Sequence, residues 1–173
     1  MIYPNRKATR IKDYDYSTPG AYFITLCTHN RQAIFGTISN GDVYHKPEMH
    51  LSYIGRIAEN EILNIEKHYT NISIDKYVIM PNHIHIIIRI TERINPFPTA
   101  PKFDIPNVVG KFKAAVTRNV GKAFMPSAKL WQTSFHDHII RGEKDFREIW
   151  QYIDTNPEKW TQDCFYIPSE VTP

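Results

Sequence analysis

Apolar and polar positions recur along the chain with two periods, which predict strands and helices. Runs rich in β-branched and aromatic residues, typical of strands, cover residues 21–28, 72–79, 83–90 and 130–140. Apolar residues that return every three or four positions, as on one side of a helix, cover residues 52–68, 107–124 and 143–155. The last helix should stop at Asn156-Pro157, because the residue before a proline is biased away from helical geometry.

Turn and loop signals separate these segments. Residues 34–45 predict a small hairpin, since Asn40-Gly41 is a favoured two-residue turn. Residues 91–106 contain four prolines and predict an irregular loop. Residues 1–19 are expected to form a basic arm before the first strand, and residues 161–173 a short tail.

The order of these segments predicts an α+β fold with one mostly antiparallel central sheet, as in a ferredoxin-like or RRM-like sandwich. We expect helices on one face of this sheet, with the strands at 72–79 and 83–90 in its centre and a C-terminal helix that carries Tyr152. A chain of 173 residues with 42% hydrophobic residues can bury a sizeable core. Residues 1–173 are therefore expected to form a single domain.

Two histidines mark the strand that follows the Pro81-Asn82 break. Side chains alternate faces along a strand, so His83 and His85 should point the same way while Ile84 points opposite. Two imidazoles on one face can bind one metal ion. A histidine beside apolar residues is more often a partly buried side chain with a polar partner, and the pair alone leaves both interpretations open.

The last predicted helix carries a second polar pair. Tyr152 and Asn156 are four residues apart and therefore lie on one side of the helix, next to the side formed by Ile149 and Ile153. If the helix packs on the central strands, this pair can meet the histidines. The alternative is structural, with Tyr152 at the edge of the core and Asn156 as a helix C-cap.

Charge and cysteine content say less about the partners and chemistry of the protein. The net charge of +3 permits a nucleic-acid partner without requiring one. The two cysteines, Cys27 and Cys164, show no metal or disulfide spacing, which favours free thiols. The N-terminus lacks a signal-peptide core, and no apolar run is long enough for a membrane span, so we expect a cytoplasmic protein without a membrane partner.

Three ordered motifs resemble those of the REP-associated tyrosine transposases, within the single-tyrosine HUH transposase superfamily. The motifs are Pro81-Asn82-His83-Ile84-His85, then Leu130-Trp131-Gln132 with Asp137-His138-Ile139-Ile140-Arg141, then Tyr152-Ile153-Asp154-Thr155-Asn156-Pro157. The resemblance extends from about Tyr22 to Trp160, which is most of the chain.

The resemblance implies a metal-dependent endonuclease and strand transferase for single-stranded DNA. His83 and His85 match the histidines that bind a divalent ion, Mg²⁺ or Mn²⁺, and Asn156 matches a third ligand. Tyr152 matches the nucleophile that becomes joined to the 5′ phosphate. The expected DNA contains hairpins formed by palindromic repeats, no organic cofactor is implied, and the protein is expected to be a monomer or a homodimer.

Further residues are weaker candidates. Possible phosphate contacts lie at Arg31, Lys111, Lys113 and Arg141. His136 and His138 form a rival histidine pair, although hydrogen bonding is the simpler role for His138. Tyr14, Tyr16 and Tyr22 could stack on bases, with a core position favoured for Tyr22. Trp131 is most simply a packing residue.

Two other functions remain compatible with the sequence. A non-catalytic nucleic-acid-binding module would bind DNA in a salt-sensitive way without needing Tyr152. A zinc hydrolase would use the same histidines, but it requires a third nitrogen, sulfur or carboxylate ligand.

Overall fold

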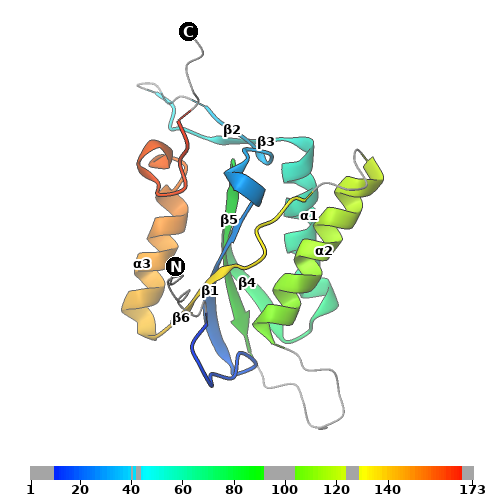
Figure 1. Cartoon of the computed structure of the whole chain (residues 1–173). Coiled ribbons are helices and arrows are strands. Elements are labelled where there is room, and N and C mark those ends of the chain that lie inside the picture. The colour runs from blue at the N-terminus through cyan, green and yellow to red at the C-terminus, as the bar shows by residue number, and fades with distance from the viewer. Residues whose placement is uncertain (1–9, 40, 42–43, 92–103, 124–128, 169–173) are drawn as a thin grey trace, which may run out of the picture.

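A four-stranded antiparallel sheet forms the centre of the protein. The computed structural model describes residues 10–39, 41, 44–91, 104–123 and 129–168. The main strands are β1 (Gly20–Cys27), β4 (Ile72–Met80), β5 (His83–Ile90) and β6 (His136–Ile140), in the order β4-β5-β1-β6 (Figure 1). Neighbouring strands are antiparallel throughout. The predicted α+β class and antiparallel sheet are therefore confirmed, whereas β4 lies at an edge of the sheet and not in its centre.

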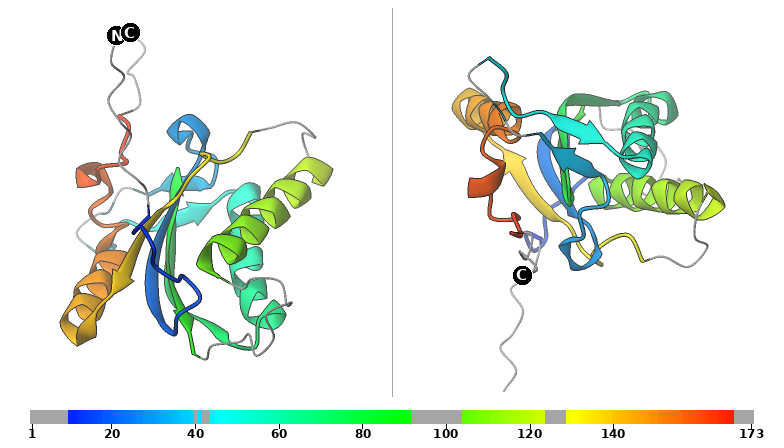
Figure 2. Two further views of the ribbon diagram at one scale, coloured as in Figure 1. Left: turned by 60° about the horizontal axis from the view of Figure 1, so that its bottom comes forward. Right: turned by 90° about the horizontal axis from the view of Figure 1, so that it is seen from above.

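Two helices cover one face of the sheet and the third covers the other. Helices α1 (Tyr53–His68) and α2 (Ile105–Ala123) pack on one side, and α3 (Gly142–Thr155) lies across the sheet from them (Figures 1 and 2). The prediction of helices on one face thus holds for α1 and α2 only. The reason is that β1 and β5 are apolar on both faces, so each face needs a cover.

The two faces have different cores. The α1 and α2 side holds the larger cluster, whose fully buried members include Tyr22, Ile24, Ile62, Ile86 and Val116. The α3 side holds Ala21, Ile87 and Ile153, with Phe23, Val78, Ile140, Phe146, Ile149 and Trp150 packed around them. This second cluster is smaller because polar side chains share that face.

Helix α1 is fixed at its N-terminus to residues Ile34 and Phe35, which lie just before β2. Ser52 is the N-cap, since its hydroxyl accepts a hydrogen bond from the Gly55 amide at 3.0 Å and donates one to the Ile34 carbonyl at 2.7 Å. Gly55 is required for a close approach, because a Cβ there would overlap the carbonyl oxygen of Phe35.

Two predicted strands are shorter or differently paired in the structure. Only residues His136–Ile140 of the 130–140 run join the sheet, although Trp131 forms an isolated bridge with Thr28. The small hairpin pairs β2 (Gly36–Ile38) with β3 (Met49–Leu51), and Ile38 faces Met49. A two-residue turn at Asn40-Gly41 would have joined closer residues, so that prediction was wrong; Asn40 itself lies outside the described residues.

The described part of the N-terminal arm packs on the protein. Tyr16 is 5% exposed and donates a hydrogen bond to Asp137 at 2.6 Å, and Tyr22 is fully buried. Tyr14 shares a hydrogen bond with Tyr22 at 3.2 Å. Residues 1–9 and most of the predicted loop at 91–106 lie outside the described residues.

The C-terminal segment crosses back over the sheet. After α3, the short 3-10 helix η2 (Trp160–Gln162) leads into residues 163–168. Asn82, at the β4–β5 turn, donates a hydrogen bond to the Phe165 carbonyl at 2.9 Å. The expected tail is therefore part of the packed structure where it is described. No helix among the described residues has the length and apolar character to cross a membrane.

Candidate active site

His83 and His85 face α3 from the interior strand β5. Because residues at spacing two point to the same side of a strand, their rings lie together, with centroids 4.5 Å apart. Both side chains are buried, at 0% and 1% exposure. The predicted convergence of the two imidazoles is present.

Hydrogen bonds fix the tautomer of His83. Asn82 Nδ2 donates to the carbonyls of Arg31 and Phe165, which leaves Asn82 Oδ1 as an acceptor. This oxygen lies 2.9 Å from His83 Nδ1, so Nδ1 carries the proton. His83 Nε2 is then a bare lone pair, and it is buried without a hydrogen-bond partner.

His85 is oriented in the same manner. Its Nδ1 lies 2.8 Å from the hydroxyl of Thr25, the residue directly opposite on β1. If Nε2 of His85 binds a metal, Nδ1 carries the proton and donates it to this hydroxyl. Nε2 then lies on the same face of β5 as His83 Nε2. A polar partner on the second ring nitrogen is the usual arrangement for histidines that bind metals.

Both imidazoles are held in the neutral form that binds metals. Burial, with a smaller effect of the Arg31 charge, lowers the pKa of His83 to about 3. Burial and the neighbouring His83 lower the pKa of His85 well below its ordinary value. Neutral imidazole is the ligand form, so these histidines need not lose a proton at neutral pH.

Helix α3 places Tyr152 above the histidines. Ile153 on the same helix is 1% exposed and packs on the sheet, and Trp150 lies beside Lys76 of β4. These contacts fix the rotation of the helix, so that the Tyr152 hydroxyl lies 3.2 Å from His85 Nε2. Tyr152 is 39% exposed, which leaves its ring partly open to solvent.

Asn156 lies one turn further along α3 and is 2% exposed. Its Nδ2 donates a hydrogen bond to Asp163 at 2.9 Å, whereas its Oδ1 is buried without a partner. An unpaired buried carbonyl oxygen is costly unless a cation or a donor meets it. Asn156 does occupy the helix C-cap, as the structural interpretation proposed, but that position does not satisfy its side-chain oxygen.

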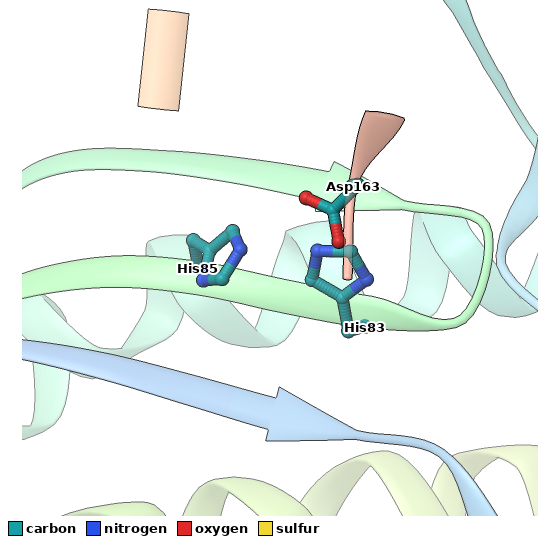
Figure 3. Close-up of side chains that lie close together, drawn as sticks. All are labelled: His83, His85 and Asp163. Carbon is teal, nitrogen blue, oxygen red and sulfur yellow. The ribbon is translucent and has the colours of Figure 1, made fainter. Parts of the chain in front are cut away.

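Asp163 completes the site, and sequence reasoning missed it. Its carboxylate accepts hydrogen bonds from Tyr152 at 3.2 Å, from Asn156 at 2.9 Å and from the Phe165 amide at 2.7 Å. One of its oxygens and one nitrogen from each of His83 and His85 all lie within 4.8 Å of one another (Figure 3). An acidic residue in a segment without periodicity gave no signal that it would fold back onto β5.

The donor atoms fit a divalent cation. His83, His85 and Asp163 together offer two neutral imidazole nitrogens and one carboxylate. Asn156, whose Nδ2 donates to that carboxylate, adds an unpaired Oδ1. A mixed nitrogen and oxygen set of this kind suits Mn²⁺, and Mg²⁺ through its oxygens, but zinc also accepts two histidines and a carboxylate. The ligands alone therefore do not separate a transposase from a zinc hydrolase, whereas a tyrosine beside them is not needed by a hydrolase.

The C-terminal segment covers the histidines. The Phe165 ring lies 4.6 Å from the His83 ring and the Trp160 ring 6.0 Å from it, measured between centroids. Since His83 has no exposed surface, a phosphate group can reach its ring only if the side chains of Phe165 and Trp160 move aside. Burial and the Asp163 carboxylate also raise the pKa of Tyr152, so the phenol is protonated in this arrangement.

The family of the chain follows from most of its sequence. Residues 19–156 match the family described as "Transposase IS200 like". The chain belongs to the IS200-like transposase family. The resemblance inferred from the three motifs is thereby confirmed at the level of the family.

The chain is also similar to one protein in sequence and to one solved structure in fold. An uncharacterised protein of Haemophilus influenzae is 34% identical over 179 residues, with 94% of each chain covered. A solved REP-associated tyrosine transposase, bound to a REP hairpin, is 22% identical, with a TM-score of 0.62 over 87% of this chain and 74% of that one. At this identity, the structural likeness establishes a common fold.

The predicted phosphate contacts lie at different distances from the candidate site. Arg31 is exposed beside the site, where its guanidinium donates to the Cys164 carbonyl at 3.2 Å. Lys113 is half-buried and donates to the Gln132 carbonyl at 2.6 Å. Lys111 lies on the α1 and α2 side, over the ring of Tyr69. None of these contacts tests a role in DNA binding.

Arg141 and His138 both contact Asp145 in the first turn of α3. Arg141 is the residue before the helix, and its amide donates to Asp145 at 2.8 Å. His138 Nε2 is 2.9 Å from the same carboxylate, so the simpler hydrogen-bonding role fits the structure. His136 faces Thr25 across the strand pair and is exposed. Trp131 is 7% exposed and packs against Phe35, as a packing residue would.

Proposed function

We propose that this protein cleaves and rejoins single-stranded DNA through a covalent link between Tyr152 and a 5′ phosphate. The observation that supports it most is the position of the Tyr152 hydroxyl, 3.2 Å from both His85 Nε2 and an Asp163 oxygen. A phenol at a cluster of metal-binding atoms is placed to attack a phosphate that reaches the same cluster.

The chain's own residues account for most of the chemistry. The Tyr152 oxygen forms a bond to phosphorus as the bond from phosphorus to the 3′ oxygen breaks; the phenol loses its proton and the 3′ oxygen gains one. The new ester retains the energy of the broken one, so the reverse attack rejoins the strand without a nucleotide cofactor. His83, His85, Asn156 and Asp163 would hold the divalent ion, Mg²⁺ or Mn²⁺. When bound, such an ion supplies Lewis-acid stabilisation of charge on the phosphate oxygens.

The expected substrate is DNA with hairpins formed by palindromic repeats. The solved relative with the same fold is bound to a REP hairpin, and this supports the same class of partner here. Arg31, Lys111, Lys113 and Arg141 are the proposed phosphate contacts along the strand. A monomer or a homodimer, a single domain and a cytoplasmic location all stay predictions.

A labelled hairpin oligonucleotide with a single-stranded flank tests the proposal in the presence of Mn²⁺. We expect a protein–DNA adduct that survives a denaturing gel, is lost in Tyr152→Phe, and is lost when the ion is chelated. Tyr53→Phe is the matched control, since Tyr53 is 52% exposed at the start of α1. An undiminished adduct in Tyr152→Phe would exclude Tyr152 as the nucleophile.

The same experiment separates the two other functions. A binding module would retain the hairpin without any adduct, and its affinity would be unchanged in Tyr152→Phe. A hydrolase would release free 5′ phosphate ends without linking them to the protein. The membership of the IS200-like transposase family favours the proposed strand transfer over both.

A further inference from the structure

One buried amide connects the metal-binding histidine to the loop that carries Arg31. Asn82 is 2% exposed; its Oδ1 accepts a hydrogen bond from His83 Nδ1 at 2.9 Å, and its Nδ2 donates one to the Arg31 carbonyl at 3.2 Å. Its backbone carbonyl accepts hydrogen bonds from the amide and the hydroxyl of Thr28, at 2.9 and 3.0 Å. The position of Arg31 is therefore tied to that of His83 through a single side chain.

The loop at Arg31 contains two consecutive residues with positive φ angles, which are rare for residues other than glycine. Asn30 and Arg31 have φ angles of 53° and 54°, in the left-handed region where a Cβ is unfavourable. Such residues persist where surrounding contacts determine the conformation, and they concentrate at functional sites. Here the contacts come from Asn82 and from Thr28, whose carbonyl accepts a hydrogen bond from the Arg31 amide at 3.2 Å.

The guanidinium of Arg31 lies at the opening of the site. It donates to the Cys164 carbonyl, next to Asp163, and its Cζ lies 5.3 Å from the centre of the Phe165 ring. Its charge is close enough to His83 to oppose protonation of that imidazole. A cavity of about 820 Å³, lined partly by Arg31, Trp160 and Tyr166, opens beside it.

We propose that Arg31 binds the oxygens of the phosphate that Tyr152 attacks, and that Asn82 positions Arg31 for this contact. This inference rests on the proposed function. A planar guanidinium can donate two parallel hydrogen bonds to a phosphate, and charge on those oxygens is greatest while phosphorus is being transferred. Arg31 would exchange the Cys164 carbonyl for the phosphate when the Phe165 ring moves aside.

Single-turnover adduct formation with the hairpin oligonucleotide and Mn²⁺ tests Arg31. At saturating DNA, we expect Arg31→Ala to lower the rate by about 100-fold, as for loss of one charge-stabilising donor, and to weaken DNA binding by less than about threefold. Arg31→Lys should recover part of the rate. Arg147→Ala is the matched control, because it removes an exposed arginine from α3. A rate in Arg31→Ala within threefold of this control would overturn the inference.

A modified substrate identifies the phosphate that Arg31 contacts. A methylphosphonate at the cleaved position, mapped first with the unaltered protein, removes the charge from that linkage. It should slow the unaltered protein strongly and slow Arg31→Ala much less, because the partner of the missing charge is already gone. An equal penalty in both proteins would place Arg31 elsewhere on the DNA.

The positioning role of Asn82 has its own readout. Asn82→Asp keeps an acceptor for His83 but loses the donor to the Arg31 and Phe165 carbonyls, so the adduct rate should fall. The double variant, Asn82→Asp with Arg31→Ala, should form the adduct no more slowly than Arg31→Ala alone. If the two residues acted independently, their effects on the rate would multiply. If the unaltered protein forms no adduct dependent on Tyr152, the proposed function itself fails; a normal adduct in Arg31→Ala refutes only this inference.

Discussion

The hydroxyl of Tyr152 lies 3.2 Å from Nε2 of His85, although the two residues are 67 positions apart in the chain. The contact depends on two periodic elements meeting at one orientation. Strand β5 presents its histidines on the α3 face, and Ile153 and its neighbours seat α3 on that face. Asp163 then closes the arrangement from a third segment of the chain.

Removal of the Asp163 charge should weaken metal binding. Asp163→Asn replaces the carboxylate of the ligand group with a neutral amide, so we expect Mn²⁺ affinity, measured by titration calorimetry without DNA, to fall at least about tenfold, or 1.4 kcal/mol. Asp154→Asn is the control, since Asp154 pairs with Lys76 at the surface of α3. Equal Mn²⁺ affinities in the two variants would show that Asp163 is not a metal ligand.

Acidification should destabilise the metal-free protein. Burial lowers the pKa of folded His83 to about 3 from an ordinary value of 6.5, so between these values the unfolded state binds more protons than the folded state. The free energy of unfolding therefore falls as the pH drops below 6.5, by about 1.4 kcal/mol per pH unit for His83 alone. His85 acts in the same direction.

Urea unfolding between pH 7 and pH 5, with a chelator present, measures this dependence. His83→Gln should reduce the slope, whereas His50→Gln, which removes an exposed histidine from β3, should leave it unchanged. A stability that stays constant over this range would contradict the buried neutral histidines.

The Phe165 side chain should limit access to the site. Phe165→Ala removes the ring that packs on His83, so DNA should reach the histidines more readily and adduct formation should become faster. A loss of roughly 1.4 kcal/mol of apolar contact corresponds to about a tenfold increase in rate. Ile167→Ala, at a 50% exposed position of the same segment, is the control. An unchanged rate would mean that Phe165 does not restrict entry.

Two helical glycines should respond oppositely to alanine. At Gly55 the new Cβ would overlap the Phe35 carbonyl oxygen, so we expect Gly55→Ala to lower the free energy of unfolding by about 2 kcal/mol or more. At Gly110 no atom lies within 4 Å of an added Cβ, and alanine should stabilise α2 by about 0.5–1 kcal/mol. Chemical denaturation of both variants measures the difference; the same sign in both would contradict the packing of α1 on the Phe35 segment.

Sequence patterns predicted most of the elements and three of the four candidate metal ligands. The helices at 52–68, 107–124 and 143–155 differ from the observed bounds by at most two residues, because their apolar periods are long and regular. The strand at 130–140 was predicted too long, since apolar residues before His136 pack into the core outside the sheet. Whether His83, His85, Asn156 and Tyr152 act as the family implies stays a prediction.

By itself, the sequence determined which side chains share a direction. A strand repeats every two residues and a helix about every 3.6, so His83 with His85, and Tyr152 with Asn156, are paired by local geometry. Tertiary structure alone decided that α3 covers the face opposite α1 and α2, that Asp163 returns to β5, and that Gly55 is crowded while Gly110 is open. These outcomes depend on packing between distant segments, which a local repeat does not specify.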